Sequence, residues 1–260
     1  MSERHAIGFF AGLGYVRRGA RFVYRERPEL ARLWLPPLAI TFAGLLGVLW
    51  LVLHFHGAAI DMVWPLPRGE GWLVTVGRGV HHVLEAVATL VLGAAGVVAV
   101  ALAGSVIAAP FNDALSEAVE ASRTGRRGPG VSMRAIARDL VRAVGLQLAK
   151  LALYAVVMGA LFLVGLVLPG LGTLLSPPVG FAITALFFAI DYMDWPASHH
   201  GLTGRARMAF ALGHLRPALG LGTGIWLLLL VPLLDLLFMP AAVAGATLLF
   251  LDLQAEAGRP

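Results

Sequence analysis

The sequence contains no cysteine, a single lysine and few charged residues of any kind. Charged types make up 13% of its 260 residues, whereas an ordinary soluble domain carries about 25% because its surface must be hydrated. Apolar types make up 58%, and the mean hydropathy is +0.81. These values exclude a soluble globular domain and a disordered chain, and the missing cysteines exclude a secreted disulfide scaffold. The sequence therefore predicts an integral membrane protein.

The sequence also lacks the motifs that carry enzyme chemistry. It has no phosphate-binding P-loop, no serine nucleophile elbow and no HExxH zinc motif. Asp191 and Asp194 are spaced like a pair of Mg²⁺ ligands, but residues 197–208 add no further acid. His81 and Glu85 share one helical face without a third ligand nearby in the sequence. We therefore expect no enzyme activity, no metal site and no bound cofactor.

Two apolar runs in the first half are long enough to cross a bilayer. Residues 34–55 contain no charged side chain, and residues 83–109 contain only Glu85. As helices, these runs would extend for about 33 and 40 Å, and a hydrocarbon core is about 30 Å thick. Both runs are predicted to be full transmembrane helices, and the second is expected to tilt.

The apolar runs of the second half are interrupted by prolines. Residues 151–190 carry no charge, and residues 217–251 carry only Asp235. The prolines that we expect to break helices are Pro169, Pro177, Pro178, Pro232 and Pro240. The arms at 218–231 and 241–251 are then too short to span a bilayer. This pattern favours two re-entrant hairpins, at 151–190 and 217–251. Two ordinary hairpins of kinked spans, six spans in all, remain the alternative.

The basic residues lie between the apolar runs rather than along one polar face, which disfavours nucleic-acid binding. Residues 1–33 hold seven arginines against three acids, and residues 111–150 hold six arginines and one lysine against four acids. The segment 57–82 carries two charges of each sign. By the positive-inside rule, the amino terminus and the segments 111–150 and 191–216 lie in the cytoplasm, whereas 57–82 lies outside.

Two basic segments have the spacing of amphipathic helices. In residues 7–25, Arg17, Arg21 and Arg25 recur at every fourth position, and residues 131–150 place three arginines opposite an apolar face. Basic amphipathic helices of this kind lie in the headgroup layer. The complete prediction is an all-α integral membrane protein, with the whole chain as one membrane domain. It has two full transmembrane helices, two hemi-penetrating helical hairpins and interfacial amphipathic helices.

Four short blocks match a known pattern. They are residues 12–15 (GLGY), 108–113 (AAPFND), 191–196 (DYMDWP) and 231–247 (VPLLDLLFMPAAVAGAT). In this order they resemble the superfamily of CysZ-type sulfate permeases and the etoposide-induced protein 2.4. The resemblance implies two spans and two hemi-penetrating hairpins, a homo-oligomer in the bacterial inner membrane, contact with membrane lipids, and uptake of sulfate or a similar anion.

The resemblance also implies an anion site just before the first span. Members of the superfamily carry a Pro-Gly-Leu-Arg-Arg-like stretch there, in which arginines and backbone amides at a helix start hold the anion. The corresponding residues of this chain are Pro28, Glu29, Leu30, Ala31 and Arg32. We expect Arg27, Leu30 and Arg32 to form the site, and we expect the carboxylate of Glu29 to weaken it.

Two further polar residues, Asp235 and Asn112, are candidates for the pore or its gate. Asp235 lies in an apolar stretch, where a carboxylate is costly unless it lines a permeation path, pairs with an arginine or marks the wet tip of a hairpin. Asn112 belongs to the block at 108–113. We therefore predict a CysZ-like permease or channel for a small inorganic anion. The alternative is a non-transporting, membrane-organising or lipid-binding protein that has kept the fold and lost the anion site.

Overall fold

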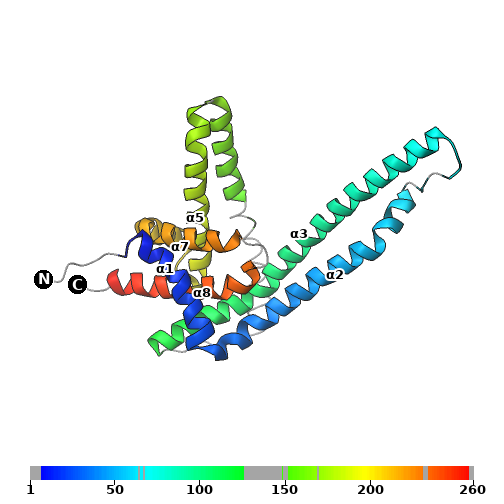
Figure 1. Ribbon diagram of the computed structural model, residues 1–260. Helices are drawn as coiled ribbons and strands as arrows, with labels where there is room; N and C mark the ends of the chain where they lie inside the picture. Colours follow the sequence, from blue (N-terminus) through cyan, green and yellow to red (C-terminus); the bar gives the residue numbers. More distant parts are fainter. Residues whose placement is uncertain are drawn as a thin grey trace. The chain divides into compact units, whose positions relative to one another are not determined.

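The computed structural model describes residues 7–63, 65–66, 68–125, 148, 152–168, 170–230 and 234–257, and the regular secondary structure of these residues is helical. The main helices in Figure 1 are α1 (Phe9–Arg21), α2 (Ala31–Val63), α3 (Trp72–Thr124), α5 (Leu171–His199), α6 (Gly204–Gly213), α7 (Leu215–Leu229) and α8 (Leu234–Ala257). A further helix covers Ala152–Val167.

Four of these helices, α2, α3, α5 and α8, are long and apolar enough to cross a membrane. The predicted all-helical character and the presence of several helices of membrane-spanning length are therefore confirmed. The two predicted spans, 34–55 and 83–109, lie within the longer helices α2 and α3. The predicted amphipathic helix at 131–150 lies outside the described residues except for position 148.

The chain forms two compact units. Unit 1 comprises Met1–Leu35 and Ala109–Pro260, and unit 2 comprises Pro36–Ala108. The prediction of one membrane domain over the whole chain stays a prediction, because compactness does not decide how many functional domains a membrane chain has.

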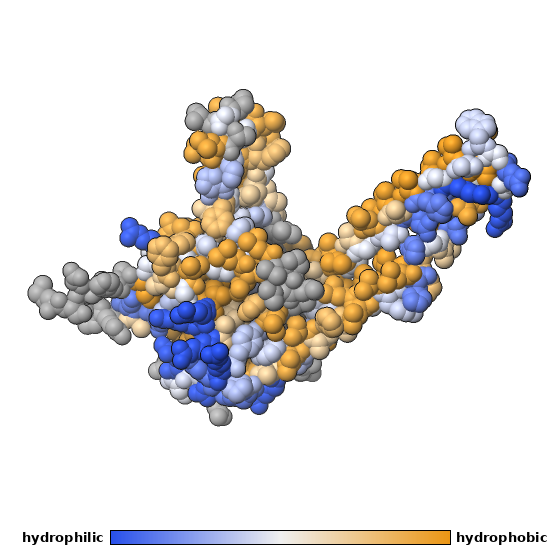
Figure 2. Space-filling model, viewed as in Figure 1, coloured by the Kyte–Doolittle hydropathy of each residue, from blue (hydrophilic) through white to orange (hydrophobic). Residues whose placement is uncertain are grey.

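Unit 2 is an antiparallel pair of helices formed by most of α2 and part of α3. Small residues bring the two backbones close together: Gly96 faces Val48, and Gly104 faces Thr41. Only 6% of the most apolar stretch of each helix is buried, and Figure 2 shows apolar residues over much of the visible face of the pair. Since large exposed apolar surfaces of this kind are unstable in water, lipid or other protein must cover them.

Unit 1 has a protein-packed core. Helix α1 packs against α7 and α8, and α5 packs against the same two helices. The core side chains include Tyr15 of α1, Leu115 of α3, Ala189 of α5, Leu221 of α7 and Leu249 of α8. The most apolar stretch of α8 is 67% buried. Helix α8 is therefore surrounded mainly by other helices of its own unit.

Glycines let the helices of unit 1 touch backbone to backbone. A Cβ atom on Gly19 of α1 would overlap the backbone of Ala241 and Gly245 of α8. A Cβ atom on Gly220 of α7 would overlap the backbone carbonyl of Phe9 in α1. Close approach at small residues is typical of helix pairs in membranes, where packing replaces the hydrophobic effect as the attractive force.

The helix Ala152–Val167 and α5 form a hairpin, and Figure 1 shows them side by side. The chain reverses near Gly170, whose φ of 98° lies in the left-handed region that favours glycine. The Tyr154 hydroxyl lies 3.0 Å from Oγ1 of Thr184 and joins the two arms.

Three of the prolines do not end helices, so the prediction that they would do so is wrong. Pro177 and Pro178 lie inside α5, and Pro240 lies inside α8. The predicted arm at 241–251 is consequently part of a longer helix, α8. The physical reason is that a backbone shielded from water has no better partner than its own helix, so neighbouring helices and small local adjustments accommodate the lost hydrogen bond.

Candidate functional site

The predicted anion site lies in the short connection between α1 and α2. A π-helical turn, η1 (Phe22–Glu26), and a 3-10 turn, η2 (Pro28–Leu30), lead from one helix into the other. Arg27 lies between these turns: its backbone N–H donates to the Phe22 carbonyl at 2.8 Å, and its own carbonyl accepts from the Leu30 N–H at 3.0 Å. The side chain of Leu30 is buried in the core of unit 1. Leu30 therefore anchors the connection, and its amide already has a partner.

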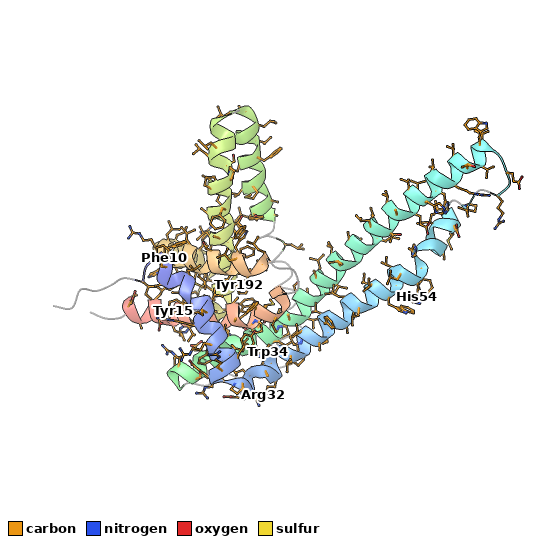
Figure 3. The ribbon with its side chains drawn as sticks, viewed as in Figure 1. Phe10, Tyr15, Arg32, Trp34, His54 and Tyr192 are labelled. Atoms are coloured by element: carbon orange, nitrogen blue, oxygen red, sulfur yellow. The ribbon has the colours of Figure 1, made fainter. Side chains whose placement is uncertain are left out.

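The charged side chains of this connection stay at the surface. Nη1 of Arg27 lies 3.3 Å from Oε1 of Glu29, and both side chains are about half exposed, at 47% and 54%. Arg32 is exposed in the first turn of α2 (Figure 3). The pKa of Glu29 is lowered, mainly by its own backbone N–H. Desolvation opposes this effect, and the hydrogen bond and charge of Arg27 and the charge of Arg32 add to it. The Glu29 carboxylate thus interacts with groups that also bind anions.

Two aromatic residues that the sequence analysis did not single out hold the connection against the rest of unit 1. The rings of Tyr24 and Trp34 meet edge to face, with their centroids 5.5 Å apart. The Tyr24 hydroxyl donates to the Leu237 carbonyl of α8, and burial raises the pKa of Tyr24 to about 12. The indole Nε1 of Trp34 is buried and has no hydrogen-bond partner among the described residues. No periodic pattern marks Tyr24, because it lies in an irregular turn.

The predicted pore residue Asn112 lies at a helix contact inside unit 1. It is 4% exposed, and its Nδ2 lies 3.7 Å from the sulfur of Met239. One turn further along α3, the hydroxyls of Ser116 and Thr247 are 2.9 Å apart and fully buried. A short line of polar side chains therefore joins α3 to α8. Asp235 lies in the first turn of α8, but its side chain is outside the described part of the chain.

A second polar cluster joins the end of α5 to α3. His199 Nε2 lies 2.9 Å from Oδ1 of Asp113, and its Nδ1 lies 3.5 Å from Oε2 of Glu120. His200 Nε2 lies 2.8 Å from the other oxygen of Glu120. A neutral imidazole can donate from only one nitrogen. His199 therefore satisfies both carboxylates only as an imidazolium.

Asp191 and Asp194, which are spaced like Mg²⁺ ligands in the sequence, have other partners. Oδ1 of Asp194 accepts a hydrogen bond from Nη1 of Arg207 at 2.7 Å, and Asp191 has an interaction of its own. Among the residues that the structure describes, no group of three or more histidines and acids is arranged to hold a metal ion.

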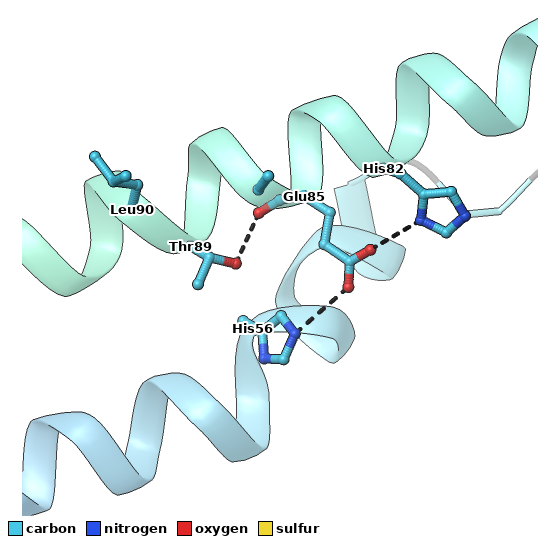
Figure 4. Close-up of a pocket in the computed structure, with 6 residues that line it drawn as sticks. His56, His82, Glu85, Thr89 and Leu90 are labelled. Atoms are coloured by element: carbon cyan, nitrogen blue, oxygen red, sulfur yellow. Dashed lines mark hydrogen bonds and ion pairs between the residues drawn. The ribbon is translucent and has the colours of Figure 1, made fainter.

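Unit 2 has its own polar cluster, drawn in Figure 4. Glu85 of α3 faces His56 of α2 at 3.5 Å and His82 at 3.3 Å. These residues line a shallow pocket of about 460 Å³. His81 faces Asp61 at 3.6 Å instead. His81 and Glu85 share one helical face in the sequence but have different partners, and the His56–Glu85 and Asp61–His81 contacts both link α2 to α3.

The comparisons with known proteins agree with each other. A family model described as Sulfate transporter CysZ/Etoposide-induced protein 2.4 matches residues 15–240. A Pseudomonas paraeruginosa protein named sulfate transporter CysZ is 28% identical over 248 residues, covering 95% of this chain and 96% of that protein. A Pseudomonas fluorescens protein of the same name is 28% identical over 240 residues, 92% of each.

A more similar but shorter match comes from a Pectobacterium atrosepticum protein, also named sulfate transporter CysZ. It is 38% identical over 150 residues, which cover 56% of this chain and 53% of that protein. The matched segment thus spans about half of the Pectobacterium protein, whereas the matches to the two Pseudomonas proteins span nearly their whole length.

Proposed function

Because this chain belongs to the sulfate transporter CysZ/etoposide-induced protein 2.4 family, we propose that it is a membrane permease or channel for a small inorganic anion, with sulfate as the first candidate. Relatives that align over nearly their whole length are named sulfate transporters. A transporter that moves an inorganic anion needs neither a bound cofactor nor a catalytic set of residues, so we assign it no enzyme activity.

The observation that carries the proposal is the position of two arginines at the start of α2. Arg27 and Arg32 are exposed on either side of the buried anchor Leu30. Guanidinium groups bind oxyanions through parallel charge-assisted hydrogen bonds, and the positive end of a helix adds to the attraction. The Leu30 amide already donates to the Arg27 carbonyl, so the two side chains supply most of the binding.

The membrane arrangement is proposed on the same basis. We place the chain in the bacterial inner membrane as a homo-oligomer in contact with lipid, with the amino terminus in the cytoplasm. Helices α2 and α3 provide the two full spans, and the hairpins at 151–190 and 217–251 enter the bilayer without crossing it. Asp235 and Asn112 are proposed to lie along the permeation path or its gate. The strong burial of α8 within unit 1 supports a hairpin that is covered by protein rather than by lipid.

The proposal is tested by anion flux and binding with the purified full chain. Radioactive sulfate should enter proteoliposomes faster than protein-free liposomes. The Arg32→Ala variant should weaken sulfate binding by about 1.5–3 kcal/mol, the usual contribution of a charged hydrogen bond. Arg25→Ala is the control, because Arg25 is an exposed arginine of η1 outside the proposed site. An Arg25→Ala variant that loses as much binding as Arg32→Ala would contradict the site.

A second candidate function is a membrane-organising or lipid-binding protein without transport. It is favoured by the exposed basic side of α1, which carries Arg17, Arg18 and Arg21 together with the strongly exposed Phe10. Such a surface suits anionic headgroups. The absence of sulfate flux together with tight binding to anionic vesicles would favour this function.

A further inference from the structure

The ion pair between Arg27 and Glu29 lies inside the proposed anion site. The carboxylate of Glu29 contacts the guanidinium of Arg27 at 3.3 Å. Its own backbone N–H and the charge of Arg32 also favour the ionised carboxylate. These three groups, one backbone amide and two arginines, are of the kinds that bind oxyanions. The carboxylate thus occupies the place of a ligand.

The chemistry of the carboxylate explains why it can stand in for the transported anion. A carboxylate and a sulfate both present oxygen atoms that accept charge-assisted hydrogen bonds from a guanidinium. A guanidinium can bind two anions, but the N–H groups that donate to one carboxylate are then unavailable to another ligand. The charges of the site add up to one positive unit, because Arg27 and Arg32 contribute two and Glu29 removes one. A doubly charged anion is therefore incompletely neutralised.

The ion pair between Arg27 and Glu29 is weak enough to open. Both side chains are about half exposed, and exposed ion pairs are weak because water screens them. Glu29 cannot leave the neighbourhood, however, because the adjacent Leu30 is buried in the core. A tethered group competes at an effective concentration that is typically in the millimolar range for a short connection.

We infer that the Glu29 carboxylate is a tethered competitor of the transported anion, which binds Arg27 only when the Arg27–Glu29 pair opens. This inference rests on the proposed function of the site. We therefore expect a low affinity for sulfate in the parent protein and a smaller loss of affinity for singly charged anions. Glu29 is then a residue that sets specificity rather than one that binds the substrate.

The test compares two variants that remove the same charge from the same connection. Glu29→Gln should strengthen sulfate binding about fivefold, the ratio expected when an exposed ion pair no longer competes. The gain should be smaller for nitrate, which carries one charge. Glu26→Gln is the matched control, because Glu26 pairs with Arg21 at the same distance of 3.3 Å but outside the site. Affinity is measured by calorimetry on the detergent-solubilised full chain, and Glu29→Ala repeats the test with a shorter side chain.

Two results would overturn the inference. One is an unchanged or weaker affinity for sulfate in both Glu29 variants, and the other is an equal gain in Glu26→Gln, which would indicate only a general effect of net charge. A double-mutant cycle adds a direct check: in an Arg27→Gln background, Glu29→Gln should give no gain.

The inference and the proposed function fail in different ways. The Pseudomonas paraeruginosa relative serves as the positive control for the assay. If that protein binds sulfate while the parent chain and both Glu29 variants do not, the proposed anion function itself is wrong. If the parent binds sulfate and the Glu29 variants match it, only the role of Glu29 is wrong.

Discussion

The hydroxyl of Tyr15 lies 2.6 Å from Oδ2 of Asp252, and this hydrogen bond joins α1 to α8 across 237 residues of sequence. The other carboxylate oxygen of Asp252 lies 3.2 Å from Nη2 of Arg123 in α3. Burial raises the pKa of Tyr15, and the hydrogen bond and charge of Asp252 raise it further. One carboxylate therefore holds three helices of unit 1 together.

We expect Tyr15→Phe to lower the free energy of unfolding by about 1.5–3 kcal/mol, because the lost hydrogen bond is to a charged group. Tyr154→Phe is the control, since it removes a hydroxyl that bonds the neutral Thr184 and should cost only about 0.5–1.5 kcal/mol. Thermal unfolding in detergent measures both. A larger loss for Tyr154→Phe would contradict the importance of the Asp252 contact.

The glycine contacts of α1 give a second prediction. Gly19→Ala should destabilise the protein by about 1–3 kcal/mol, because its new methyl group would overlap the backbone of α8. Gly14 lies in the same helix with open space around its Cβ position. The Gly14→Ala variant should therefore be more stable than the parent by about 0.5–1 kcal/mol. Similar effects of the two substitutions on melting temperature would show that α1 does not pack against α8 as described.

The raised pKa of Tyr24 predicts that the protein loses stability in strong alkali. Its pKa is raised to about 12 by burial, above the ordinary value of about 10. A raised folded pKa means that the contribution to stability is complete below about pH 10 and is lost as the pH rises towards about 12. The Tyr24→Phe variant should lack this alkaline component. Melting curves between pH 8 and pH 12 would contradict the prediction if both proteins lost stability in parallel.

The re-entrant hairpin at 151–190 can be tested by cysteine labelling, since the chain contains no cysteine. Leu168→Cys, beside the turn at Gly170, should resist a membrane-impermeant thiol reagent added from the periplasmic side. Leu66→Cys, in the segment predicted to lie outside, should react readily and serves as the control. Ready labelling of position 168 from that side would instead support six full spans.

The sequence was sufficient for features that depend on composition over many residues. The uncharged run at 34–55 and the nearly uncharged run at 83–109 lie within long helices because a bilayer-length apolar segment can satisfy its backbone only as a helix. The prediction of helix ends at Pro177 and Pro240 failed, because a backbone shielded from water would lose more hydrogen bonds by leaving the helix than the single bond that a proline removes.

Contacts between distant segments could not be predicted in the same way. The regular spacing of Arg17 and Arg21 marked the exposed side of α1, but the opposite side depends on Gly12 and Gly19, whose partners are more than 190 residues away. At the candidate site, the resemblance to known permeases predicts Arg27 and Arg32, and both remain predictions. It could not identify Tyr24, whose hydroxyl bonds α8, because a backbone acceptor leaves no trace in the sequence.

The packing of α1 against α7 and α8 also sets an order for biosynthesis. Helix α1 leaves the ribosome first, but the residues that cover its glycine face, such as Ala241 and Gly245, are made more than 200 positions later. At a translation rate of about 5–20 residues per second, the helix waits roughly 10 to 45 seconds for its partners. During that time the membrane surface or a chaperone must shelter its apolar side. Unit 1 therefore completes its core only at the end of synthesis, after α2 and α3 have been made.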